Sequence, residues 1–192
     1  MTRGMKSDGP YTISKAVPNI QNNSWWQRII SVNTLKPRII ISGGQSGADI
    51  AALEWAKARG WKTGGIMPYG YRTEFGSKPE YKDLYGMFIT KEYADYKHRT
   101  LLNVKNSDYT IIFGKSYSPG TKHTIACASK SKKPYIAIDP YEKQYNMAIS
   151  AEKLKLDNDF LCAMIVNVAG NRETVSPGIG TLLKQLLDKV FE

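Results

Sequence analysis

Several features that define other protein classes are scarce in this chain of 192 residues. Its two cysteines, Cys127 and Cys162, cannot build a disulfide framework or an all-cysteine zinc site, so we expect a reducing, cytoplasmic setting and predict no metal site. Aliphatic stretches such as 39–41 are far shorter than the roughly 20 apolar residues that cross a membrane. We find no secretory signal pattern and no internal repeat. A globular protein that does not enter membranes is therefore expected.

Charge is the unusual bulk property. The formal net charge is +10 at pH 7, and half of it lies in residues 1–38. A basic surface suits anionic partners such as nucleotides, phosphorylated cofactors or nucleic acid, but it also simply keeps a protein soluble. Charge alone does not decide between these two roles.

The first 36 residues differ from the rest in being rich in glycine, proline and polar residues, with no periodicity before Ser24. Ser24 suits the cap of a short helix over 25–31, whose apolar stripe would hold Trp25, Trp26, Ile29 and Ile30. We expect residues 1–36 to be a basic extension, partly disordered or forming a helix that docks on its own domain or on a neighbouring subunit. A helix that binds another partner or a membrane surface is the alternative. Residues 37–192 then form one ligand-binding domain.

Strand and helix patterns alternate from Arg38 onward. Short β-branched runs predict strands at 38–42, 61–66, 109–113, 135–138 and 161–168, with a further one suggested at 87–89. Helical periodicity falls at 48–60, 98–106, 121–131 and 178–191, whereas 154–159 is expected to be connecting structure. This alternation predicts an α/β, Rossmann-like, doubly wound domain with a mostly parallel sheet and helices on both faces.

Ligands of such sheets bind at the carboxyl ends of the strands, so the loops that follow the strands are the candidate site. The first of these loops is glycine-rich and enters a helix, whose free N–H groups favour a phosphate. The loops that follow the other strands offer further glycines, hydroxyls and arginines, although each of these loops is also compatible with an ordinary turn or an exposed loop without a ligand. The predicted ligand-binding residues are Ser42, Gly43, Gly44, Gln45, Ser46, Gly47, Arg72, Gly120, Thr121, Thr124, Asn171 and Arg172. Asp49 and Glu173 are the candidate catalytic carboxylates.

These loops, taken in order, resemble those of the molybdenum cofactor carrier family. The matching segments are 41–49, 63–65, 99–108, 119–121 and 167–179, and the resemblance covers about residues 37–192. That family belongs to a Rossmann-like superfamily that also contains cytokinin-activating phosphoribohydrolases and the DNA-processing protein DprA. The resemblance implies that the chain binds the molybdenum cofactor, a phosphorylated pterin with its own sulfurs, and forms a homo-oligomer.

One departure from the superfamily bears on catalysis. The phosphoribohydrolases carry a glutamate that assists cleavage of an N-glycosidic bond, and Thr124 stands at that position here. A carrier without chemistry is therefore the favoured function. The alternative is a nucleoside 5′-monophosphate N-glycoside hydrolase in which Glu173 or Asp49 replaces the missing carboxylate. Nucleic-acid binding ranks third, because no motif beyond the basic charge supports it.

Overall fold

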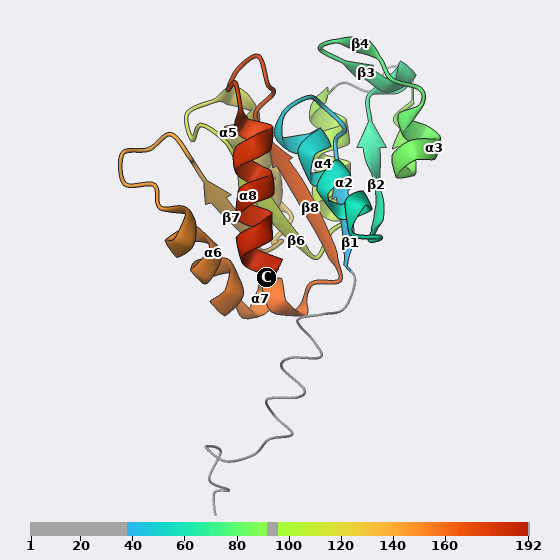
Figure 1. Cartoon of the computed structure of the whole chain (residues 1–192). Helices are drawn as coiled ribbons and strands as arrows, with labels where there is room; N and C mark the ends of the chain where they lie inside the picture. The colour runs from blue at the N-terminus through green and yellow to red at the C-terminus, as the bar shows by residue number, and fades with distance from the viewer. Residues whose placement is uncertain (1–37, 92–95, 192) are drawn as a thin grey trace, which may run out of the picture.

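The computed structural model describes residues 38–91 and 96–191. Their centre is a six-stranded sheet in the order β5-β2-β1-β8-β6-β7, and every neighbouring pair in it is parallel (Figure 1). The strands are β1 (Ile39–Ser42), β2 (Lys62–Met67), β5 (Met87–Ile89), β6 (Tyr109–Phe113), β7 (Tyr135–Ile138) and β8 (Ile165–Gly170). The predicted α/β, Rossmann-like arrangement is confirmed.

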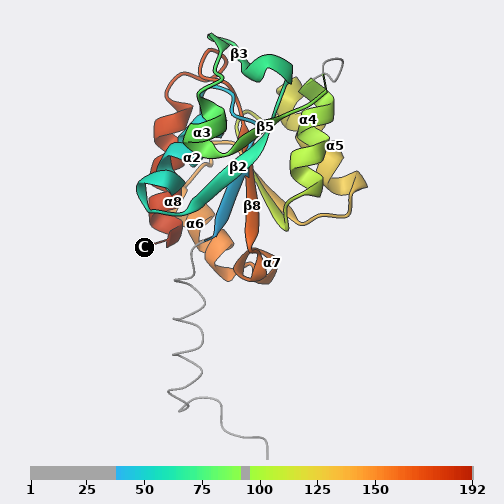
Figure 2. The ribbon, with the colours of Figure 1, turned by 90° about the vertical axis from the view of Figure 1, so that its right-hand side faces the viewer.

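Helices cover both faces of the sheet, as Figure 2 shows. On one face lie α2 (Ala48–Ala58), α3 (Tyr81–Tyr85), α6 (Met147–Leu156) and α8 (Ile179–Phe191). On the other lie α4 (Tyr96–Lys105) and α5 (Pro119–Lys130). Strands covered in this way must be apolar on both sides, which is why β1 reads as an unbroken aliphatic run. The largest apolar cluster joins β1, β6 and β8 to α2 and α8, with Ile40 and Leu183 fully buried in it.

Two predictions in the C-terminal third were wrong. Residues 154–159 are not connecting structure but the end of α6 and the start of α7 (Asn158–Cys162). Side-chain caps start both helices: Asn146 accepts hydrogen bonds from the first turn of α6, and Asp157 does so for α7. The last strand therefore starts at Ile165 rather than at residue 161.

The segment after β2 is more ordered than a plain loop. It forms a 3₁₀ turn, η2 (Tyr69–Tyr71), and then a small antiparallel hairpin of β3 (Arg72–Thr73) and β4 (Gly76–Ser77). The strand suggested at 87–89 is present as β5.

The helix predicted at 25–31 lies outside the described residues, and so does the whole of the basic extension, residues 1–36. Within the two described ranges, no helix is both long and apolar enough to cross a membrane.

Candidate ligand-binding site at the carboxyl edge of the sheet

A cavity of about 480 Å³ lies where the carboxyl ends of the central strands meet. Helix α2 leaves β1 toward one face of the sheet and α5 follows β6 on the other, so their loops diverge on either side of β8. Such a divergence is the usual ligand crevice of doubly wound sheets. The lining residues are Gln45, Asp49, Tyr96, Lys97, Arg99, Thr100, Ser118, Pro119, Gly120, His123, Thr124, Ala169, Gly170, Asn171, Arg172 and Val175.

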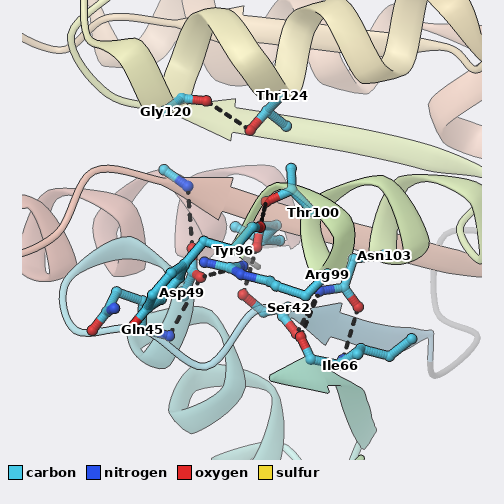
Figure 3. Close-up of polar contacts among 12 residues, drawn as sticks. Ser42, Gln45, Asp49, Ile66, Tyr96, Arg99, Thr100, Asn103, Gly120 and Thr124 are labelled. Carbon is cyan, nitrogen blue, oxygen red and sulfur yellow. Dashed lines mark hydrogen bonds and ion pairs between the residues drawn. The ribbon is translucent and has the colours of Figure 1, made fainter. Parts of the chain in front are cut away.

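Asp49 connects three parts of the cavity wall. It lies in the first turn of α2 and is 2% exposed. One carboxylate oxygen accepts the Gly170 N–H at 3.2 Å, and the other accepts the Gln45 N–H and the Arg99 Nη1, each at 3.3 Å (Figure 3). Burial raises the pKa of Asp49, while the Arg99 charge and the hydrogen bonds act in the opposite direction. Asp49 therefore fixes α2, the end of β8 and Arg99 relative to one another.

Arg99 reaches this position because residue 43 is a glycine. A Cβ added at Gly43 would lie 1.3 Å from the Arg99 Nη1, so any larger residue would displace the guanidinium. The Arg99 Nε is buried without a hydrogen-bond partner. Asp49 thus leaves much of the donor capacity of this guanidinium unused.

Asn103, one turn after Arg99 on α4, joins that helix to the sheet. Its side-chain oxygen accepts the Ile66 N–H at 2.8 Å, and its amide nitrogen donates to the carbonyls of Ile66 at 3.0 Å and Ser42 at 3.3 Å (Figure 3). The carboxyl ends of β1 and β2 are thereby held to α4. This bridge sets where Arg99 enters the cavity.

The first turn of α5 forms the opposite wall. Ser118 caps the helix by accepting the Thr121 N–H at 3.2 Å, and Thr124 donates its hydroxyl to the Gly120 carbonyl at 3.0 Å. Figure 3 shows Gly120 and Thr124 across from Asp49 and Arg99. A helix N-terminus carries a partial positive charge. With Lys97, Arg99 and Arg172 in the lining, and Asp49 as the one carboxylate among the described lining residues, the cavity favours an anion.

Asn171 fastens the loops after β6 and β8 to each other. Its side chain is buried, accepts the Lys115 N–H at 2.6 Å and donates to the Ser118 hydroxyl at 2.8 Å. Its carbonyl accepts the Ala48 N–H at 3.1 Å, so this first-turn amide of α2 is already bonded within the protein. Gly47, at φ 76°, permits that approach, because a Cβ there would lie 2.5 Å from the Asn171 oxygen.

The structure brings five of the twelve predicted ligand-binding residues, together with Asp49, to this cavity. The ones that line it are Gln45, Asp49, Gly120, Thr124, Asn171 and Arg172. Ser42 donates to the Val168 carbonyl at 2.6 Å, Gly44 packs on Met67, and Thr121 belongs to the α5 cap.

The remaining predicted residues lie elsewhere at the same edge. Ser46, Gly47 and Glu173 line a second hollow of about 350 Å³, bordered by α2, α8 and the hairpin. Asp49 and Glu173 therefore do not share a cavity. Arg72 lines neither hollow; it is exposed and donates to the Tyr69 carbonyl at 3.1 Å.

Sequence reasoning left α4 out of the site. Tyr96, Lys97, Arg99 and Thr100 all come from this helix, which carries no glycine-rich entry loop to draw attention to it. The one sequence feature that pointed to this helix was segment 99–108, which resembles the corresponding segment of the molybdenum cofactor carrier family. The resemblance did not indicate what these residues do. His123 also lines the cavity, with its Nε2 3.4 Å from the Cys127 Sγ and 3.3 Å from the Lys97 carbonyl.

Comparison with known proteins places this geometry in a family. The model of the circularly permutated YpsA SLOG family (cpYpsA) matches residues 40–191. The chain belongs to this family. If β8 were counted first, the sheet order would read 4-3-2-1-5-6, in which the strands follow one another outward on both sides of β8.

A crystal structure from Syntrophus aciditrophicus SB, named "Putative molybdenum carrier protein", is similar to this chain. The sequences are 31% identical, the alignment covers 81% of this chain and 96% of that one, and the TM-score is 0.72. A structure of (E)-4-hydroxy-3-methyl-but-2-enyl diphosphate reductase also aligns, at 10% identity and a TM-score of 0.34, over 87% of this chain and 66% of that one. The search of curated proteins gives no match.

Proposed function

We propose that this cpYpsA-family chain is a non-catalytic carrier that binds a phosphorylated small ligand, with the molybdenum cofactor as its cargo. The observation that carries the proposal is the cationic cavity between α2, α4, α5 and the end of β8. Its volume of about 480 Å³ falls within the roughly 300–1,000 Å³ of small-molecule sites. The similarity to a structure named as a molybdenum carrier supports the choice of cargo.

The lining fits the organic part of this cargo. Lys97, Arg99 and Arg172 offer charge to a phosphate, and the first turn of α5 adds its positive end. Gln45 and Thr100 add polar groups suited to a heterocycle. Among residues 38–91 and 96–191, no three His, Cys, Asp or Glu side chains gather as a metal site, and the cofactor carries its own dithiolene sulfurs.

Hydrolysis of an N-glycosidic bond is the second candidate, because one carboxylate, Asp49, does line the cavity. Three hydrogen-bond donors already hold that carboxylate, and Glu173 faces the other hollow. Thr124, at the position of the superfamily glutamate, donates its hydroxyl to Gly120 instead of offering a base. Binding without turnover is therefore favoured.

Mass spectrometry and metal analysis of the purified protein test the carrier proposal directly, alongside an assay for free base released from nucleoside monophosphates. A co-purified pterin phosphate and no base release are expected. Release of base that Asp49→Asn abolishes would instead establish the hydrolase. The homo-oligomer and the cytoplasmic location remain predictions, and light scattering measures the former.

Two arginines provide a matched pair of variants. Arg172→Gln is expected to weaken binding of a pterin phosphate about tenfold or more, because it removes a charge from the cavity lining. Arg72→Gln removes the same charge from an exposed position outside the cavity and should leave affinity within about twofold. Calorimetry measures both. Equal effects of the two substitutions would count against this cavity as the binding site.

A further inference from the structure

Glu74, which the sequence did not single out, has an unusual environment for a residue of a surface hairpin. It lies between β3 and β4, yet its side chain is only 8% exposed. Its carboxylate accepts hydrogen bonds from the Ser46 hydroxyl and from both the N–H and the hydroxyl of Thr174. The Arg172 Nη1 lies 3.8 Å from the same carboxylate.

These groups form a small anion nest built from two loops. Ser46 belongs to the glycine-rich loop after β1, whereas Arg172 and Thr174 belong to the loop after β8. The Glu173 N–H donates to the Ser46 hydroxyl at 3.1 Å, which leaves the Ser46 proton free for the carboxylate. Burial alone would raise the pKa of Glu74, but the hydrogen bonds from Ser46 and Thr174 and the charge of Arg172 lower it overall. The nest therefore favours a negative charge.

The same residue is the main polar attachment of the hairpin. Its backbone N–H donates to the Gln45 side-chain oxygen at 2.8 Å. Among the described residues, every hydrogen bond or ion pair of residues 72–77 either stays within residues 69–78 or is made by Glu74. Phe75, at the tip, is 64% exposed. Displacement of the Glu74 carboxylate would therefore leave the hydrogen bond to Gln45 as the one polar attachment of the hairpin among the described residues, and would loosen the hairpin.

Arg172 connects the nest to the cavity. It contacts Glu74 and also lines the cavity, and its side chain is 51% exposed. A phosphate monoester carries about −1.5 to −2 charges at neutral pH and three acceptor oxygens, more than the Glu74 carboxylate offers. A ligand phosphate that reaches Arg172 can thus compete with Glu74 for the same donors.

We propose that Ser46, Thr174 and Arg172 form an anion site that Glu74 fills in the free chain, and that a phosphate monoester displaces Glu74 and releases the 72–77 hairpin. This inference rests on the proposed function, because it assumes a phosphorylated ligand at this rim. It names the regulation of that site: the chain's own carboxylate occupies the phosphate position until the ligand takes it.

The test measures binding of inorganic phosphate to the full chain and to two variants by calorimetry at constant ionic strength. Glu74→Gln removes the competing charge, and we expect it to tighten phosphate binding about fivefold or more. Glu54→Gln is the control: it removes one negative charge from a neighbouring exposed site, where Glu54 pairs with Lys184 at 2.6 Å. Phosphate binding to that variant should match the wild type within about twofold.

Hydrogen exchange of the unmodified protein provides a second measurement, independent of any variant. Amides of residues 72–77 should exchange faster at saturating phosphate, because Glu74 has left the nest. Unchanged or slower exchange, or equal phosphate affinities of Glu74→Gln and Glu54→Gln, would overturn the inference while leaving the proposed function in place. If neither the wild type nor Glu74→Gln binds phosphate, both proposals fail.

Discussion

Gly43 shows how one missing side chain shapes the cavity. Alanine at this position would collide with the Arg99–Asp49 pair, because the added Cβ would lie 1.3 Å from the Arg99 Nη1 and 2.7 Å from the Asp49 Oδ2. We expect Gly43→Ala to lower the free energy of unfolding by about 1–3 kcal/mol and to weaken binding of a pterin phosphate, because Arg99 must leave its position in the cavity. Urea denaturation and calorimetry measure the two effects.

Gly64→Ala is the matched control for this substitution. Its Cβ would lie 3.5 Å from the Gly86 carbonyl, an ordinary contact, in a strand of the same sheet. It should leave binding of a pterin phosphate unchanged. If Gly43→Ala also binds a pterin phosphate as the wild type does, Arg99 is not part of the site.

At the same scale, sequence reasoning found the right loop but not the roles of its side chains. Gln45 and Ser46 were predicted to bind a ligand directly, and whether they do remains a prediction. In the structure both contact Glu74, a residue almost 30 positions later in the chain. A contact of this kind leaves no periodic or local pattern in a single sequence, and the same holds for the Arg99–Asp49 pair.

At the scale of single elements, α6 and α7 depend on their caps. Asn146→Ala removes a cap whose oxygen accepts the N–H groups of Ala148 and Ile149, and it should cost about 0.5–2 kcal/mol of unfolding free energy. Asp157→Ala should lower the unfolding free energy by ~1–3 kcal/mol more than Asn146→Ala does, since Asp157 also accepts the hydroxyl of the buried Tyr109 at 2.6 Å. Chemical denaturation measures the loss of unfolding free energy in both variants. Equal losses would contradict the prediction that Asp157→Ala costs more than Asn146→Ala.

Those caps are also the signal that sequence reasoning missed. Asn146 and Asp157 are polar residues at the start of segments with weak helical periodicity, so an interpretation based on apolar spacing treats the region as a connection. By contrast β6 and β7 were predicted with their observed bounds. Both are short β-branched or aromatic runs followed by a residue that ends a strand, Gly114 or Asp139.

For the whole molecule, the fold class was predictable because strand and helix patterns alternate over most of the chain. The order of the strands was not, since no local pattern says that β8 lies between β1 and β6. The cavity depends on that placement, because it opens between helices on opposite faces of the sheet. A bound ligand therefore contacts both helical layers and should stabilise the fold as one unit.

This placement predicts that a ligand raises the stability of the entire domain. Phosphate at ten times its dissociation constant should raise the free energy of unfolding by about 1.4 kcal/mol in one cooperative transition. Thermal unfolding at matched ionic strength, with chloride replacing phosphate, isolates this effect from general salt stabilisation. Arg172→Gln should show a smaller rise at the same phosphate concentration; an equal rise would indicate that the effect does not come from the cavity.

The central position of β8 also determines when, during folding, the carboxyl edge of the sheet and its cavity can form. Ile39 pairs with Ile165, so the middle of the sheet closes only when segments 126 positions apart meet. Long-range pairings of this kind are slow to form. Until β8 inserts, β1 and β6 each lack a neighbour and one wall of the cavity is missing. The candidate site is therefore complete only in the finished fold, and the proposed binding of a cargo requires the whole sheet.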